Sequence, residues 1–343
     1  MAEPKPYHPP YTITAAILNL AAEIGELVGR LGVSSEQKLT PRLRRENRIR
    51  TIQASLAIEN NSLSLRQVSA VLEGKRVLGL PREIQEVHNA FAAYEAMDAW
   101  LPHAETDLLA AHGLLMQGLV DRPGAYRSGG AGIFRGEQLV HMAPPADRAP
   151  DLMRDLLAWL ERSQEHPLIA GCLFHYELEF IHPFADGNGR MGRLWQTLIL
   201  RRWKPLLAYL PVESVIKARQ QDYYQALAEA DAQANATPFV EYMLRMLCEA
   251  LHEALASDQA TDQAVDQVTD QVRCLLGVIG KGELTTAELM ASLGLAHRPT
   301  FRLNYLNPAL DGGWVERTRP DAPRSPAQRY RVTEKGWLWL GGN

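Results

Sequence analysis

The chain has 343 residues, of which 46% are hydrophobic, enough to fill the cores of two or three domains. Its 36 Lys and Arg residues nearly balance 40 Asp and Glu residues, and the net charge of −4 excludes a protein that binds nucleic acid or membranes through its overall charge. Three scattered cysteines, Cys172, Cys248 and Cys274, exclude a disulfide framework and predict reduced thiols in the cytoplasm.

The N-terminal segment MAEPKPYHPPYTIT is rich in proline and lacks the basic start and apolar run of a secretory signal. No window of the sequence reaches the length and apolarity of a membrane span. We therefore expect a cytoplasmic protein without a membrane partner.

Helical periodicity dominates the first 256 residues and predicts a mainly α fold. The first predicted helix covers residues 39–62, with Thr40 as N-cap, Pro41 in the first turn, and Asn60 and Asn61 as the stop signal. Apolar residues at i, i+3 and i+4 predict further helices over 81–101, 105–120, 149–164, 167–180, 188–203 and 238–256. Residues 132–145 predict a β-hairpin that turns at RGEQ.

The composition changes near residue 253, where Asp-Gln recurs every four residues and predicts a solvated helical linker to residue 268. Three predicted helices follow, and then two predicted strands over 314–319 and 329–333, an order typical of a winged helix-turn-helix. The sequence thus predicts four regions: an N-terminal helical region (1–100), a catalytic core (101–252), the linker (253–268) and a winged-helix domain (269–343).

The stretch HPFADGNGRMGR, residues 182–193, combines a histidine, an acid, three glycines and two arginines. Arg190 and Arg193 fall in the first turn of a predicted helix, where the helix dipole disfavours cations, so we expect an anion there. Backbone N–H groups at the glycines can bind phosphate oxygens, Asp186 can hold a magnesium ion, and His182 can accept a proton from a hydroxyl. A plain glycine-rich helix start explains the glycines but not the arginines.

This stretch resembles the signature of the Fic (filamentation induced by cAMP) family, His-x-Phe-x-(Asp/Glu)-Gly-Asn-Gly-Arg-x-x-Arg. The resemblance implies a protein adenylyltransferase, which moves AMP from ATP to a Ser, Thr or Tyr hydroxyl of a target protein and releases pyrophosphate. It implies that His182 is the general base, Asp186 the magnesium ligand and Phe184 an anchor in the core. The implied phosphate ligands are Gly187, Asn188 and Gly189 for the α- and β-phosphates, and Arg190 and Arg193 for the β- and γ-phosphates.

Two further places resemble the family. The hairpin residues Leu139, Val140, His141 and Met142 resemble a flap that holds the target segment by main-chain bonds, although an ordinary surface hairpin has the same pattern. Tyr223 and Tyr224 match a place where family members contact the nucleotide base, although paired tyrosines on an amphipathic helix also pack in cores. We expect His175 to be a core histidine or one that supports the site.

The stretch SLAIEN, residues 55–60, matches the family's inhibitory pattern (Ser/Thr)-x-x-x-Glu-(Gly/Asn) at Ser55, Glu59 and Asn60. Helical geometry places Glu59 about 20° beyond a narrow apolar arc and at a helix C-terminus, so a cationic partner is expected for its carboxylate. The resemblance supplies Arg193 as that partner, with Ser55 able to steady the carboxylate by a hydrogen bond. The alternative is a surface glutamate at a helix end.

The C-terminal region supports a second function class, because arginines gather on its predicted recognition helix and wing. They are Arg298, Arg302, Arg317, Arg319, Arg324, Arg329 and Arg331. A DNA-binding regulator, or a toxin-antitoxin-like module led by the winged helix, is therefore the alternative function, and protein docking or dimerisation fits the same module. The target, self-modification, AMP removal and homodimerisation stay open.

Overall fold

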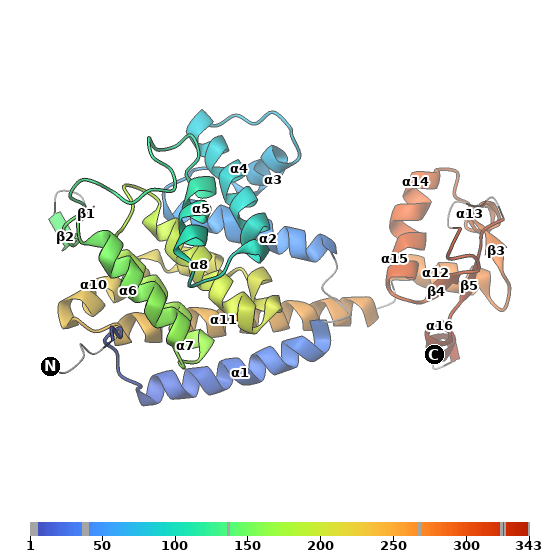
Figure 1. Cartoon of the computed structure of the whole chain (residues 1–343). Helices are drawn as coiled ribbons and strands as arrows, with labels where there is room; N and C mark the ends of the chain where they lie inside the picture. Colours follow the sequence, from blue (N-terminus) through green and yellow to red (C-terminus); the bar gives the residue numbers. More distant parts are fainter. Residues whose placement is uncertain are drawn as a thin grey trace. The chain divides into compact units, whose positions relative to one another are not determined.

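The computed structural model describes residues 6–35, 41–135, 138–266, 269–322, 325 and 327–341. The predicted N-cap Thr40 and the predicted wing residue Arg324 lie outside these ranges. Contacts divide the chain into two compact units, Met1–Ala254 and Leu255–Asn343. Both units are drawn in Figure 1.

The first unit is helical apart from one hairpin, as the sequence predicts. Its helices are α1 (Ala15–Ser35), α2 (Pro41–Ile58), α3 (Leu65–Leu72), α4 (Pro81–Ala96), η1 (Met97–Ala99), α5 (Glu105–Leu115), α6 (Ala149–Arg162), α7 (Pro167–Ile181), α8 (Asn188–Trp203), η2 (Pro205–Tyr209), α9 (Val212–Ala218) and α10 (Gln220–Gln233). Helix α11 (Thr237–Asp266) begins in this unit and contains the boundary between the two units.

Helix α7 forms the centre of the first unit. Thirteen of its fifteen residues are buried, and its polar side chains His175, Glu177 and Glu179 have hydrogen-bond partners inside the protein. It packs on α8, and the short loop between these two helices is the glycine-rich stretch that begins at His182. The candidate catalytic loop therefore joins the end of a largely buried helix to the start of the helix packed on it.

Helix α2 ends where the sequence predicts. Asn60 has a left-handed backbone (φ 68°), its N–H donates to the carbonyl of Ala57, and the N–H of Asn61 donates to the carbonyl of Leu56. These two bonds form a Schellman cap, which asparagine tolerates better than most residues because it enters the left-handed region readily. Glu59 is thereby placed at the last turn of α2.

Helix α1 is not among the predicted helices, although an apolar stripe follows the proline-rich start of the chain. Ile17, Ile24, Val28 and Leu31 recur at helical spacing and are buried, with exposed fractions of 8% or less. In Figure 1, α1 runs beside α11, and Thr14 donates to Glu241 (2.7 Å) near its start.

The hairpin consists of β1 (Gly132–Arg135) and β2 (Gln138–Met142), which pair antiparallel with a register shift between Ile133 and Phe134. The structure confirms the predicted hairpin. Within the described part of the chain, this sheet has two strands, so each strand has one edge without a strand partner.

The second unit holds the three predicted helical segments and a small sheet, followed by a further helix, α16, that was not predicted. Its elements are α12 (Asp270–Ile279), β3 (Leu284–Thr285), α13 (Thr286–Ser292), α14 (Arg298–Phe301), η3 (Arg302–Leu306), α15 (Asn307–Asp311), β4 (Val315–Arg317), β5 (Arg329–Val332) and α16 (Glu334–Gly341). The sheet has three strands in the order β3-β5-β4, so the prediction of two strands missed the short β3. The helix predicted over 298–313 contains a π-helical turn because Pro308 has no N–H to continue the α-helical ladder.

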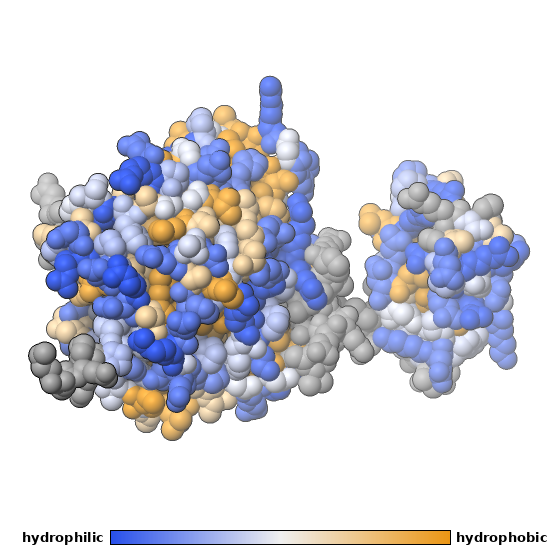
Figure 2. Space-filling view, viewed as in Figure 1, coloured by the Kyte–Doolittle hydropathy of each residue, from blue (hydrophilic) through white to orange (hydrophobic). Residues whose placement is uncertain are grey.

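Hydrophilic residues cover most of the face drawn in Figure 2, and apolar residues form small separate patches. One such patch lies near the start of α1, where Ile13 and Leu18 are exposed. No helix among the described residues combines the length and apolarity needed to cross a bilayer.

Candidate active site

His182 lies at the C-terminus of α7 with a left-handed backbone, φ 50° and ψ 57°. This conformation costs a non-glycine residue roughly 1 kcal/mol or more, so surrounding contacts must hold it. Arg127 provides them: its Nε donates to the His182 carbonyl (2.7 Å), and its backbone N–H donates to the Pro183 carbonyl (2.9 Å). Its Nη1 donates to the Gly129 carbonyl (2.8 Å). No sequence pattern indicates that this buried arginine holds the backbone of His182 in place.

The loop after His182 is closed by Asn188, which is 2% exposed. Its Oδ1 accepts from the Phe184 N–H and its Nδ2 donates to the Phe184 carbonyl, both at 2.9 Å. Phe184 is fully buried, in the position expected of a core anchor. Asn188 is expected among the phosphate ligands, and because its side chain shapes the loop, its backbone N–H is the group left for that role.

His112 of α5 contacts the loop that begins at His182 and supports its conformation. Its ring stacks on Phe184 with 3.8 Å between ring centres. The Gly124 N–H donates to Nδ1 (2.9 Å), so Nε2 carries the proton and donates to the Asp186 carbonyl (3.1 Å). Burial lowers the pKa of His112, which keeps the ring neutral. A single histidine on an apolar helix gave no sequence signal for this role.

At two positions of the loop, close contacts with neighbouring side chains favour glycine. Gly187 has φ 89°, and a Cβ there would lie 2.7 Å from the sulfur of Met116. A Cβ at Gly189 would lie 2.4 Å from Oε1 of Glu59. Within the described ranges, no residue accepts a hydrogen bond from the backbone N–H of Asn188 or Gly189. The positive end of the α8 dipole therefore has donors to offer an anion.

Asp186 joins a network of charges on the exposed side of the loop. Its Oδ1 accepts from Arg190 (2.9 Å) and its Oδ2 accepts from Arg82 of α4 (3.0 Å). Glu86, one turn after Arg82, lies 3.5 Å from Arg190. The Asp186 side chain is 41% exposed, and one accessible carboxylate beside phosphate oxygens and water fits the way proteins hold Mg²⁺. Arg82 and Glu86 resemble a surface i, i+4 pair in sequence, so they were not predicted here.

Arg193 lies on the other side of the loop, buried at 2% exposure. Its Nη2 donates to Oε1 of Glu59 (2.7 Å) and to the carbonyl of Ser55 (3.1 Å), and its Nε donates to the Ser55 hydroxyl (3.0 Å). Burial alone lowers the pKa of Arg193, but the Glu59 carboxylate outweighs it and holds the pKa above its usual value. The hydrogen bond of Ser55 in the structure is to the arginine, and its expected contact with the carboxylate stays a prediction.

Each arginine of the loop keeps one buried nitrogen available. Within the described part of the chain, Nη1 of Arg193 and Nε of Arg190 have no hydrogen-bond partner. A buried charged donor left unsatisfied costs free energy, which an anionic ligand would offset. The two arginines therefore point to an anion with several oxygens.

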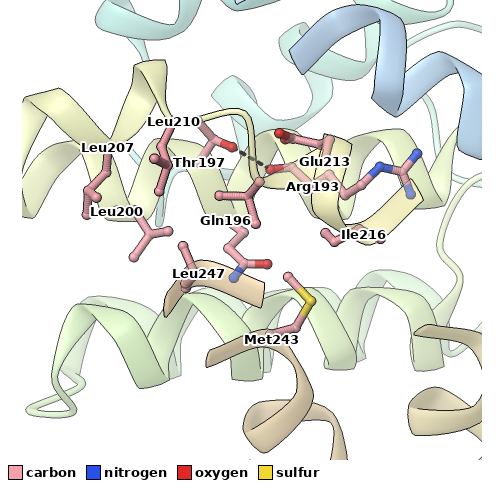
Figure 3. Close-up of a pocket in the computed structure, with 11 residues that line it drawn as sticks. Arg193, Gln196, Thr197, Leu200, Leu207, Leu210, Glu213, Ile216, Met243 and Leu247 are labelled. Atoms are coloured by element: carbon pink, nitrogen blue, oxygen red, sulfur yellow. Dashed lines mark hydrogen bonds between the residues drawn. The ribbon is translucent and has the colours of Figure 1, made fainter. Parts of the chain in front are cut away.

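A cavity of about 20 Å³ lies behind Arg193, lined by residues of α8, α9 and α11 (Figure 3). It has room for roughly one water molecule, which is far too little for a nucleotide. Glu213 lines it at 3% exposure and accepts from the Tyr94 hydroxyl (3.3 Å). Burial raises the pKa of Glu213 to about 7, although Arg193 opposes the shift.

Tyr223 is a core residue rather than a surface for a base. It is 1% exposed, and its hydroxyl lies 3.1 Å from Nε2 of His175. His175 in turn contacts Gln196 (2.7 Å), and burial lowers the pKa of His175 to about 3, so this histidine is a neutral core residue, as predicted. The base contact of Tyr223 stays a prediction, which the enclosure of its ring does not favour. Tyr224 is half-buried and remains available.

The turn that carries Glu59 is fixed from α9 and α10. Lys217 donates to the carbonyl of Ala57 (2.7 Å), and Gln220 donates to the carbonyl of Ile58 (2.8 Å). Lys217 also donates to the Gln220 side chain (2.7 Å). These contacts satisfy carbonyls at the end of α2, where a cation also matches the helix dipole.

The structure describes little of the side chains that are expected to dock a target on the flap. The side chains of Leu139, Val140 and His141 lie outside the described ones, and only their backbone pairing with β1 is described. Met142 is 67% exposed. Arg127, which bonds the His182 carbonyl, also donates to the Pro144 carbonyl just after β2 and so links the flap to the loop.

The arginine cluster of the second unit is partly neutralised. Arg331 pairs with Glu316 (2.6 Å), and Arg329 bonds the carbonyl of Glu283 (2.9 Å) and lies 3.5 Å from Glu288. Residues 269–343 carry ten basic and seven acidic side chains, which leaves a small net positive charge. The predicted basic patch is therefore weaker than the count of arginines indicates.

Comparisons with known proteins match both units. A family model described as Fic/DOC family matches residues 100–200, and one described as Filamentation induced by cAMP protein Fic-like, C-terminal domain, matches residues 270–333. The chain is 30% identical over 216 residues to "Protein adenylyltransferase fic-1" of Caenorhabditis elegans and 30% identical over 224 residues to "Protein adenylyltransferase Fic" of Aedes aegypti. These alignments cover 60% and 62% of the chain but only 40% and 42% of the relatives.

Solved structures extend the likeness to nearly the whole chain. A crystal structure of a Fic family protein from Desulfovibrio desulfuricans G20 is 71% identical, covers 96% of this chain and 99% of its own, and superposes with a TM-score of 0.74. A segment of Fic-1 from C. elegans shares the fold at 22% identity and a TM-score of 0.59. Since the first of these likenesses covers both proteins almost completely at high identity, the chain belongs to the Fic family.

Proposed function

We propose that the chain is a protein adenylyltransferase, which transfers AMP from ATP to a hydroxyl side chain of a target protein and releases pyrophosphate. The observation that carries the proposal is the pair of buried arginines, Arg190 and Arg193, each with an unpartnered nitrogen beside the free N–H groups at the start of α8. A triphosphate supplies the several anionic oxygens that such a set of donors can bind. Relatives named protein adenylyltransferase support the same activity.

In the proposed reaction, the hydroxyl oxygen of the target attacks the α-phosphorus of ATP while the bond from the α-phosphorus to the bridging oxygen of pyrophosphate breaks. His182 accepts the hydroxyl proton on its ring. The backbone N–H groups of Asn188 and Gly189 bind the phosphates, and Arg190 and Arg193 neutralise charge at the β- and γ-phosphates. Asp186 would hold Mg²⁺, which when bound neutralises charge on the phosphates.

We propose that Glu59 restrains this reaction, in keeping with the inhibitory pattern at Ser55, Glu59 and Asn60. The Glu59 carboxylate lies 2.7 Å from the arginine that would bind the γ-phosphate and against the bare Cα of Gly189. A triphosphate in that position would meet a negative charge and an arginine that is already paired. Asn60 contributes through the backbone, because its left-handed cap ends α2 and sets the place of Glu59.

We further propose that the flap residues 139–142 hold the target segment by main-chain bonds at a free strand edge, and that Tyr224 contacts the base. The free cysteines support a reducing compartment such as the cytoplasm. The described contacts of the arginine cluster do not favour DNA binding as the main function, since acidic residues of the same unit already pair with Arg329 and Arg331.

Parallel incubations with two labelled substrates test the proposal. A lysate is incubated with the Glu59→Gly chain and with ATP labelled on the α-phosphate or, separately, on the γ-phosphate. AMP transfer labels a protein band only in the first incubation, and His182→Ala in the same background removes the band. Label from the γ-phosphate alone would instead establish phosphorylation and overturn the assignment.

A further inference from the structure

Outside the candidate active site, one cluster of side chains has the composition of a metal site. Glu23 of α1 and Cys248 and His252 of α11 each place one potential ligand atom so that all three atoms lie within 4.8 Å of one another. Cys248 and His252 are four residues apart on one helix, which places both on the same face. Glu23 reaches them from the neighbouring helix α1, which runs beside α11 in Figure 1.

The contacts within the cluster favour a cation. Nε2 of His252 lies 2.9 Å from Oε1 of Glu23, and the sulfur of Cys248 lies within 4.8 Å of both groups. Within the described ranges, no Lys or Arg pairs with Glu23, so the carboxylate has an imidazole and a thiol as its only described partners. The nearby Glu249 is occupied by Arg219 at 2.7 Å and adds negative charge near the thiol.

We propose that Glu23, Cys248 and His252 bind a thiophilic divalent cation of the zinc class, with water as the fourth ligand. Thiolate, imidazole and carboxylate together suit Zn²⁺, whereas Mg²⁺ and Ca²⁺ prefer oxygen ligands alone. A tetrahedral site with Zn–S of about 2.3 Å and Zn–N of about 2.0 Å needs ligand atoms roughly 3–4 Å apart, within reach of small side-chain rotations. On binding, the Cys248 S–H bond breaks, an S–metal bond forms and the proton passes to solvent.

The location gives the site a structural consequence. Cys248 is 6% exposed, whereas Glu23 and His252 are about half exposed, so the cation would enter from solvent and close against a buried sulfur. It would join α1 to α11 in the middle of their contact. Neither the loop of residues 182–193 nor the turn that carries Glu59 contributes a residue to this cluster. The inference is therefore independent of the proposed function.

Cobalt binding provides a direct test. The full chain, free of affinity tags and stripped with a chelator, is titrated with Co²⁺, which replaces Zn²⁺ and reports its ligands by absorption. We expect one equivalent to bind with a thiolate-to-cobalt charge-transfer band and strong tetrahedral bands, and Zn²⁺ to displace it. Cys248→Ser should lose the charge-transfer band. His252→Ala and Glu23→Gln should weaken binding by at least about 10-fold, since even outer partners of metal ligands contribute that much.

Cys274→Ser is the matched control, because Cys274 is an exposed free cysteine in the other unit and should keep every band. Melting temperature with and without Zn²⁺ gives a second readout: Zn²⁺ should raise it for the wild type and for Cys274→Ser but not for Cys248→Ser. Circular dichroism of the metal-free variants checks that they fold. Absence of a thiolate band in the wild type, or its persistence in Cys248→Ser, would overturn the proposal.

Discussion

Arg190 and Arg193 are three residues apart, yet they belong to two different regions. Arg190 pairs with Asp186 of its own loop and lies 3.5 Å from Glu86, and Asp186 also pairs with the exposed Arg82. Arg193 is enclosed and pairs with Glu59, which comes from 134 positions earlier in the chain. We call residues His182–Arg190 the loop side, and Arg193 with the C-terminal turn of α2 the α2 side.

This difference predicts opposite effects of substitution. The loop side contains the groups proposed to take part in the reaction, so its substitutions should lower transfer. On the α2 side, a carboxylate occupies an arginine that the triphosphate needs, so substitutions that weaken this contact should raise transfer until Arg193 itself is lost. A loop-side substitution that raised transfer, or a weakened Glu59–Arg193 contact that lowered it, would contradict the distinction between the two sides.

The largest effect is expected for His182→Ala on the loop side. Loss of a general base lowers the rate by about 10²–10⁴-fold, whereas ATP binding should change little because the base acts on the hydroxyl and not on the phosphates. Label transfer from ATP and ATP affinity, measured by calorimetry in the Glu59→Gly background, separate the two quantities. Normal transfer by the alanine variant would remove His182 from the mechanism.

Asp186→Ala should lower transfer strongly, because Asp186 is the only carboxylate within residues 182–193 that could hold the cation that neutralises the leaving group. Turnover should also lose its dependence on magnesium concentration. Arg82→Ala is the informative control, since Arg82 contacts Asp186 from outside the loop and should have a much smaller effect. Retained magnesium-dependent activity in Asp186→Ala would place the metal ligand elsewhere.

The sequence predicted the loop side better than the α2 side's surroundings. Gly187, Asp186 and the start of α8 follow from local rules: a left-handed turn, a helix N-terminus and charges at short spacing. The end of α2 at Asn60 was likewise predicted because its cap is encoded by adjacent residues.

Arg127, His112, Lys217 and Gln220 were not predicted, because their roles depend on contacts with backbone carbonyls far away in sequence. A buried arginine and a surface arginine look alike in one sequence. The same reason applies to two surroundings that were not predicted: Tyr223 is enclosed by a core that periodicity cannot describe, and Ser55 accepts a hydrogen bond from Arg193.

On the α2 side, Glu59→Gly should raise self-modification and target labelling by about 10–100-fold, the range expected when a partly buried ion pair of roughly 1–3 kcal/mol no longer competes with the ligand. Glu59→Gln keeps the size of the side chain and tests charge alone. Arg193→Ala in the Glu59→Gly background should cancel the gain. Equal labelling of wild type and both Glu59 variants would show that this helix end does not inhibit.

Glu213 provides a further test of the α2 side, because it is a second, buried acid near Arg193. Its pKa of about 7 lies above the unfolded value near 4.5, so wild-type stability falls as pH rises between these values. Glu213→Gln should become more stable relative to wild type across that window, by about 3 kcal/mol at pH 7.5. Melting temperatures at pH 4.5 and 7.5 measure it, and the exposed Glu229→Gln should show no such trend.

The smallest effect is expected for Lys217→Met, which keeps the aliphatic stem but removes the ammonium group from the Ala57 carbonyl. A cation at a helix C-terminus contributes about 0.3–1 kcal/mol, so the turn that carries Glu59 should loosen and transfer should rise by roughly 2–5-fold. Because Lys217 touches neither Arg193 nor the phosphates, the gain should vanish in the Glu59→Gly background. Lys75→Met, a change at an exposed lysine, is the control. A Lys217 gain that persists without Glu59 would mean that the lysine acts on the site by another route than the position of α2.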